Sequence, residues 1–201
     1  MLEIEAMRLG FPFTAERVVE SSLISSVRET QTLNGGISVY QHANIELRTF
    51  DPKDVFPSAL YVLYPNLKEV GNIATELRAE GKDIFTLTDI EQTSIGVIAP
   101  PVVELSDGVP TIVDGIHRFW WALSVNKPIN AIYVENASLP IVSYPVSWDE
   151  VRLCDERPSE PRFMRKLRDG IADNSEDLRR YYRDLSFLGS KGRRPSIGQV
   201  A

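Results

Sequence analysis

The stretch from Val109 to Val125 constrains the fold more than any other part of the sequence. Residues 109–113 are mostly β-branched and read as a buried strand, and Asp114-Gly115 follows as a turn. Residues 116–125 then carry apolar side chains on one side of a helix. A strand that runs directly into a helix predicts a fold in which helices pack on a sheet.

The segments on either side supply further strands. Ile95–Leu105 is apolar but contains Pro100-Pro101, and because proline cannot donate to a ladder, an edge, a bulge or a bend is expected there. Ser106-Asp107-Gly108 predicts a hairpin turn, and Ile129–Val134 predicts another strand. We therefore expect an α/β (α+β) fold, with a small mixed sheet and flanking helices.

The ends of the chain read mainly as helices. An N-terminal helix is expected to open at Phe13-Thr14 and to bury Val19, Leu23 and Val27, and Ile37–Phe50 reads as extended. A second helix is expected from an N-cap at Asn66 to Gly81, followed by a short strand at Ile84–Thr88. Two C-terminal helices are predicted from the apolar spacing of Phe163, Leu167 and Ile171, and from Leu178, Tyr181, Tyr182 and Leu185 behind a cap at Asn174.

This pattern divides the chain of 201 residues into four parts. We expect an N-terminal helical segment at 1–36, a core at 37–145, C-terminal helices at 146–188 and a basic, flexible tail at 189–201. The hydrophobic fraction of 43% is sufficient for one packed domain. No apolar run is long enough to span a membrane, and the acidic N-terminus does not resemble a signal peptide, so a cytoplasmic protein is expected.

Charge and metal-binding residue types narrow the function classes. The net charge is −6, but residues 157–201 carry 11 basic against 6 acidic residues, while the remainder carries 11 against 22. This asymmetry leaves contact with nucleic acid open through the C-terminal end. With one cysteine, Cys154, and two histidines, a Cys-rich or multi-histidine metal site is excluded, so a catalytic metal would be a hard ion such as Mg²⁺.

The turn Asp114-Gly115-Ile116-His117-Arg118 is the candidate for chemistry. Free backbone N–H groups and the helix dipole make the start of a helix a favourable place for phosphate, and Gly115 allows close approach. His117 and Arg118 add hydrogen-bond donors and charge on the same turn. Asp-Gly is also common in ordinary strand-to-helix turns. The local pattern therefore favours a phosphate site and a purely structural turn about equally.

The block from Pro100 to Val134 resembles the ParB/sulfiredoxin superfamily. The residues that carry the resemblance are Pro100-Pro101-Val102, Gly108, Asp114-Gly115-Ile116-His117-Arg118, Ala122, Pro128 and Ile132-Tyr133-Val134. The resemblance implies nucleotide binding, with Gly115, Ile116, His117 and Arg118 at the phosphates of ATP or another nucleotide. Ile116 stands where sulfiredoxins carry their reactive cysteine, so that activity is not expected.

The resemblance also suggests which branch the chain belongs to. About 65 residues follow the core, too few for the DNA-reading and dimerisation domains of a complete partition protein. The length fits the stand-alone, plasmid-encoded proteins of the oncogenic-suppression type (Osa-like), which inhibit conjugation and are associated with ATP hydrolysis and DNA cleavage. That branch implies DNA, and a DNA-transfer or partition protein, as partners.

Roles follow for the individual residues. Asp114, His117 and Arg118 are the candidate catalytic residues, with Arg118 as a phosphate clamp and His117 as a donor or general acid/base. Asp114, together with Glu104, is the candidate ligand set for Mg²⁺. Structural alternatives are an N-cap for Asp114 and a solvent-facing helix position for His117 or Arg118.

The basic C-terminal end is the candidate nucleic-acid contact. It contains Arg162, Arg165, Lys166, Arg179 and Arg180, with Tyr181 and Tyr182 beside them. The alternative, slightly favoured, is that these cations pair with the acidic body of the same chain.

Three functions follow from these observations. The first is a nucleotide-binding phosphohydrolase, an ATPase or a Mg²⁺-dependent deoxyribonuclease. The second is a small-molecule kinase of the free-serine type, and the third is a non-catalytic, nucleotide-dependent regulatory binding module.

Overall fold

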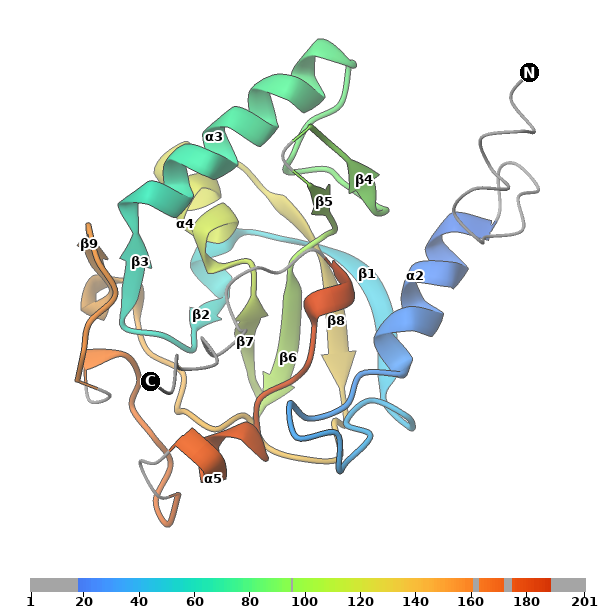
Figure 1. The fold of residues 1–201 in the computed structure, drawn as a ribbon. Coiled ribbons are helices and arrows are strands. Elements are labelled where there is room, and N and C mark those ends of the chain that lie inside the picture. Colours follow the sequence, from blue (N-terminus) through green and yellow to red (C-terminus); the bar gives the residue numbers. More distant parts are fainter. Residues whose placement is uncertain (1–17, 95, 161–162, 172–174, 189–201) are drawn as a thin grey trace, which may run out of the picture.

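A five-stranded sheet of order β1-β8-β6-β7-β2 forms the centre of the molecule (Figure 1). In the computed structural model, which describes residues 18–94, 96–160, 163–171 and 175–188, these strands are β1 (Asn44–Phe50), β2 (Phe56–Pro57), β6 (Val102–Ser106), β7 (Val109–Asp114) and β8 (Ile129–Glu135). The pairs β1–β8 and β6–β7 are antiparallel, and the pairs β6–β8 and β2–β7 are parallel. The predicted α+β fold with a small mixed sheet is therefore confirmed.

The hairpin between β6 and β7 has the turn that the sequence predicts. Asp107 and Gly108 form the two-residue connection, and both have positive φ, at 52° and 77°. Such turns match the twist of the flanking strands, and Gly or Asp tolerates the left-handed conformation. Pro100 and Pro101 lie between β5 (Val97–Ile98) and β6, which is consistent with the bend expected there.

Two helices cover one face of the sheet. They are α3 (Tyr64–Ala79) and α4 (Ile116–Ser124), and they bury a core against side chains such as Val103, Ile112 and Tyr133. Alternation along the strands sends Val102, Val113 and Ile132 to the opposite face. This alternation gives the sheet a separate core on each side.

The opposite face is covered by both ends of the described chain. Leu23 and Val27 come from α2 (Val18–Arg28), and Leu185 and Leu188 come from the C-terminal segment that ends in η4 (Ser186–Leu188). All four side chains are buried in one cluster with residues of the sheet. Residues that the sequence pattern assigns to three separate parts thus contribute to one core.

Smaller elements complete the fold. Strands β3 (Tyr61–Leu63) and β9 (Arg152–Cys154) pair in parallel, and β4 (Glu91–Gln92) pairs with β5 antiparallel. The remaining described elements are η1 (Pro52–Asp54), η2 (Trp148–Glu150) and α5 (Ser175–Arg179). A third cluster combines Val62 of β3 with Val146 and Val151.

Several predicted boundaries are wrong in the N-terminal half. Asn66 is not the N-cap of α3, because the helix begins at Tyr64 with Pro65 in its first turn, where a missing N–H costs nothing. The strand predicted at 84–88 is a turn in which Asp83 accepts from the backbone N–H of Phe85 at 3.1 Å. The extended segment begins only at Asn44, since the residues before it turn.

The C-terminal helices are shorter than predicted. Residues 163–171 form no α-helix, because the chain there runs beside residues 142–144 and Leu167 bridges to Ser143. The helix expected through Leu185 ends at Arg179, after which Arg183 pairs with Thr32. Phe13-Thr14, Arg162, Asn174 and the tail from residue 189 lie outside the described residues.

Candidate functional site at the start of helix α4

The connection between β7 and α4 is a single glycine. Gly115 adopts a left-handed φ of 83° and serves as the N-cap of α4, without a side-chain capping bond. Its carbonyl accepts from the N–H groups of Arg118 and Phe119, at 3.0 and 3.1 Å. The first turn of α4 itself contains no acidic residue, and Asp114 lies directly before its N-cap.

Gly115 is also held by close packing against the proline bend. A Cβ atom at this position would lie 2.7 Å from Cβ of Pro101 and 3.1 Å from Nη2 of Arg118. The contact with Pro101 leaves no room for a methyl group, the contact with Arg118 would be tight, and the left-handed φ adds backbone strain for other residues. The fold itself therefore requires glycine here, independently of any ligand.

Arg118 folds back over the beginning of its own helix. Its side chain is only 8% exposed, its Nη1 donates to the carbonyl oxygen of Ala99, and its Nη2 lies 4.0 Å from Oδ2 of Asp114. Burial lowers the pKa of Arg118 to about 10, and the negative charge of Asp114 opposes this shift. The guanidinium therefore stays charged at neutral pH, beside the uncapped end of α4.

His117 connects α4 to the start of α3. The backbone N–H of Leu63, the N-cap of α3, donates to Nε2 of His117 at 3.0 Å. Burial lowers the pKa of His117 to about 4, against the opposing charge of Asp114. The ring is therefore neutral at pH 7, and since Nε2 accepts a hydrogen bond, the ring proton is on Nδ1.

The two carboxylates predicted to share a metal ion are not brought together. Glu104 lies opposite Thr111 in the β6–β7 register, three residues before Asp114 on β7, which is about 10 Å along a strand. Its carboxylate is bound by Arg183 instead. Within the described residues, no group of three or more His, Cys, Asp or Glu side chains could hold a metal ion.

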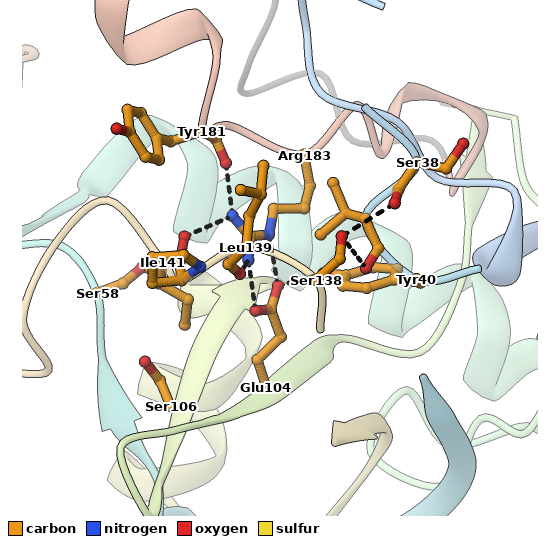
Figure 2. Close-up of polar contacts among 12 residues, drawn as sticks. Ser38, Tyr40, Ser58, Glu104, Ser106, Ser138, Leu139, Ile141, Tyr181 and Arg183 are labelled. Carbon is orange, nitrogen blue, oxygen red and sulfur yellow. Dashed lines mark hydrogen bonds and ion pairs between the residues drawn. The ribbon is translucent and has the colours of Figure 1, made fainter. Parts of the chain in front are cut away.

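A buried network around Arg183 is the site feature that the sequence pattern does not reveal (Figure 2). The Nε and Nη2 atoms of Arg183 donate to the two carboxylate oxygens of Glu104, both at 2.7 Å. The hydroxyl of Tyr40 donates to the same carboxylate. The guanidinium also donates to the backbone carbonyls of Leu139, Pro140 and Tyr181. A glutamate inside an apolar strand is the one signal that a buried cation is needed.

The remaining large apolar residues near the turn are partly buried and pack against the cores. Ile116 contributes to two of the three cores, Trp120 makes an edge contact with Trp148, and Trp121 makes one with Phe85. The ring centroids are 6.0 and 5.6 Å apart. Ile116 is thus a packing residue, and its side chain offers no polar group to a ligand at the turn.

Several of the basic C-terminal residues that the structure describes are held by contacts within the chain. Arg165 donates to the carbonyl of Ser58 at 3.0 Å, Lys166 pairs with Glu150, and Arg180 lies 3.7 Å from Asp177. Arg179 is exposed on α5. Two further cations, Arg168 and Arg183, pair with Asp107 and Glu104. Pairing with acidic groups of the same chain is thus observed for several of these cations.

The fold and this turn define an α+β domain in which a central strand leads through glycine into a helix, with a buried arginine at the helix start. Residues 22–152 match the ParB CE domain family, which is more than half of the chain, and the chain belongs to that family. No curated protein and no solved structure matches it. In the part of the chain that the structure describes, no helix is long and apolar enough to cross a membrane.

Proposed function

We propose that this ParB CE domain binds the phosphate groups of a nucleotide at the start of α4. The observation that carries the proposal is the buried guanidinium of Arg118, which lies over the uncapped first turn of the helix. A fixed positive charge beside free backbone N–H groups suits phosphate, and its burial means that little reorganisation is needed on binding. The backbone N–H groups of Ile116 and His117 would hold the phosphate oxygens together with Arg118.

The role of His117 in this proposal is donation of a hydrogen bond. Its Nε2 accepts from Leu63, and a pKa of about 4 leaves the ring neutral. A general base would need a free ring nitrogen that takes up a proton near neutral pH. The Nδ1–H group can still donate to a phosphate oxygen, so the donor role is better supported than proton transfer.

Asp114 fits the proposal only if a cation accompanies the nucleotide. Its side chain is 15% exposed beside Arg118, and a bare carboxylate there would repel phosphate. Mg²⁺ is commonly held by one or two carboxylates together with phosphate oxygens and water, and Asp114 alone satisfies that minimum. The ion would supply charge neutralisation, as in other sites that handle nucleotide phosphates.

Hydrolysis is the finer part of the proposal, either of ATP or of DNA. Because Glu104 is bound to Arg183 and His117 is neutral, Asp114 is the carboxylate proposed to act beside the phosphates, together with the charge of Arg118. This arrangement supports a nucleotide-dependent binding module more strongly than rapid turnover. We also propose that the cellular role of this protein is that of the Osa-like branch, inhibition of conjugative DNA transfer. A mating assay with a plasmid donor strain that expresses the protein would test this role.

Calorimetric titration with ATP and Mg²⁺ tests the proposal, with Arg118→Lys next to the unchanged protein. We expect saturable binding that the substitution weakens at least about tenfold, because lysine cannot bridge Ala99 and a phosphate in the same geometry. Lys68→Ala, which removes an exposed cation on α3, is the matched control and should bind normally. Thermal unfolding of each variant separates lost binding from lost folding.

Phosphate release and nicking of linear DNA, measured in the same samples, distinguish the functions. Turnover that disappears in Asp114→Asn supports the phosphohydrolase, whereas binding without turnover supports the regulatory module. Absence of ATP binding by the folded, unchanged protein, with other nucleoside triphosphates also inactive, would reject the site assignment.

A further inference from the structure

A pocket lies at the opposite end of α4 from the candidate phosphate site. Its volume is about 240 Å³, and it is lined by Ala74, Arg78, Gly81, Lys82, Asp83, Ile84, Phe85, Trp121 and Lys127. The last turn of α3 supplies Arg78, the turn after α3 supplies residues 81–85, and α4 and the residues after it supply Trp121 and Lys127. None of the residues assigned to the phosphate site lines it.

The floor of this pocket is aromatic and rigid. Phe85 and Ile84 are buried in the first core, and Trp121 packs edge-on against Phe85 at an interplanar angle of 72°. Trp121 is itself only partly buried, so part of its indole faces the pocket. A fixed aromatic surface of this kind stacks planar rings at a low cost in conformational entropy.

The rim of the pocket is cationic in a protein of net charge −6. It carries Arg78, Lys82 and Lys127 against one carboxylate, that of Asp83, which lies 3.4 Å from Nζ of Lys127. Lys82 is paired with Glu91 and, at 3.5 Å, with Glu80, both of which offset its charge. Arg78 is exposed, and within the described part of the chain its side chain makes no hydrogen bond or ion pair. Arg78 is therefore the cation most open to a ligand, and Lys127, which is 52% exposed and paired with a single carboxylate, is the next.

An aromatic floor and a basic rim together match one nucleotide unit. We propose that this pocket takes a nucleotide, with its base on Trp121 and its phosphate at Arg78 and Lys127, as a second site independent of the start of α4. Stacking on an aromatic side chain contributes about 1–3 kcal/mol per base, and basic groups beside it hold the phosphate. The volume is below the 300–1,000 Å³ that is typical of sites for larger ligands, which favours a single nucleotide unit.

The unit has two sources, a free nucleotide or a residue within single-stranded DNA, and the chemistry of the pocket is the same for both. A purely structural explanation of the cations also exists, because Arg78 and Lys127 lie near helix C-termini, where positive charge offsets the dipole. That explanation predicts an effect of substitution on stability and none on ligand binding. The two accounts are therefore separable by one set of variants.

The experiment is a titration of the full chain, followed by tryptophan fluorescence, with thymidine monophosphate, an eight-residue oligothymidylate and inorganic phosphate. We expect quenching that saturates with at least one of the two nucleotide probes and that Trp121→Phe removes. Arg78→Ala and Lys127→Ala should each weaken the binding about tenfold, which corresponds to one charge-assisted contact. Lys68→Ala, about 15 Å along α3 from Arg78, is the matched control and should bind normally.

The comparison of probes assigns the source. Tighter binding of the oligonucleotide than of the monophosphate identifies a DNA strand, and equal binding identifies the free nucleotide. The proposal is overturned if neither nucleotide probe binds, if Arg78→Ala and Lys127→Ala leave binding unchanged, or if inorganic phosphate binds as tightly as the nucleotides. Binding that is lost only in Arg118→Lys would belong to the start of α4 and would equally overturn it.

Discussion

Arg183 and Glu104 lie 79 residues apart in the sequence and form a bidentate ion pair. Both N–O distances are 2.7 Å, and both side chains are 2% exposed. The contact joins the C-terminal segment to the middle strand of the sheet. Arg183 keeps its positive charge. Burial by itself would lower the pKa of its guanidinium, but the carboxylate of Glu104 raises that pKa. Buried pairs of this kind are costly to break from one side only.

Arg183→Met should lower the free energy of unfolding by about 3–5 kcal/mol, because it leaves the carboxylate of Glu104 buried without a counter-ion. Urea denaturation at pH 7 measures this change. The double variant Glu104→Gln/Arg183→Met should lose less, since a neutral amide can still accept from Tyr40. Arg179→Ala, at an exposed arginine nearby, should stay within about 0.5 kcal/mol of the unchanged protein. A double variant less stable than Arg183→Met would contradict this account.

Gly115→Ala should destabilise the fold more than Gly81→Ala. Both glycines have positive φ, at 83° and 77°, but a Cβ at Gly81 meets no atom within 4 Å, whereas one at Gly115 meets Pro101. The strain common to both costs about 1 kcal/mol, and the clash adds to it only at Gly115. Thermal and urea unfolding of the two variants give the difference directly. Equal losses would show that the contact with Pro101 relaxes without cost.

Stability should fall as the pH is lowered from 7 to 5, in part through His117. Its pKa is lowered from 6.5 in the unfolded chain to about 4 in the fold, so the unfolded state binds more protons between these values. The contribution of His117 to the free energy of unfolding is present above pH 6.5 and is lost as the pH falls toward 4. About 2 kcal/mol of it is lost between pH 7 and 5. Urea titrations at both values, compared with His117→Gln, isolate this part. A pH dependence that is unchanged in the variant would exclude His117 as its source.

A chain that ends at residue 180 should be markedly less stable than the full chain. It lacks Arg183, Leu185 and Leu188, which neutralise Glu104 and close the second core. A loss of 3 kcal/mol or more corresponds to a Tm lower by about 10 °C for a domain of this size. Circular dichroism melting tests this, and Leu105→Ser in the full chain, at an exposed apolar side chain, serves as a mild reference. A truncated chain that melts with the full one would show the C-terminal segment to be dispensable.

Local sequence signals predicted the middle of the fold well. Asp107-Gly108, Pro100-Pro101 and Asp114-Gly115 impose turns through backbone conformation alone, and the strands and the helix between them follow. The C-terminal helix predicted at 163–171 failed because the pairing of that segment with residues 142–144 is a tertiary contact. Apolar spacing in the sequence does not distinguish a helix face from a segment packed along another strand.

The candidate site was predictable in position but not in arrangement. The turn at 114–118 is visible in the sequence, yet nothing local shows that Arg118 points back to Ala99 or that His117 accepts from Leu63. The sequence favours a metal role for Glu104 because nothing local indicates its partner, Arg183, which lies 79 residues away. Charge pairing across a fold depends on topology, which residue types alone do not give.

The contact between Gly115 and Pro101 links two positions into one unit of sequence variation. Among members of the family, a side chain at position 115 should occur only together with a change in the proline bend, so the two positions should covary. A protein engineer who moves the first turn of α4 to another scaffold would have to transfer the bend with it. The smallest portable form of this site is therefore two separate segments of the chain.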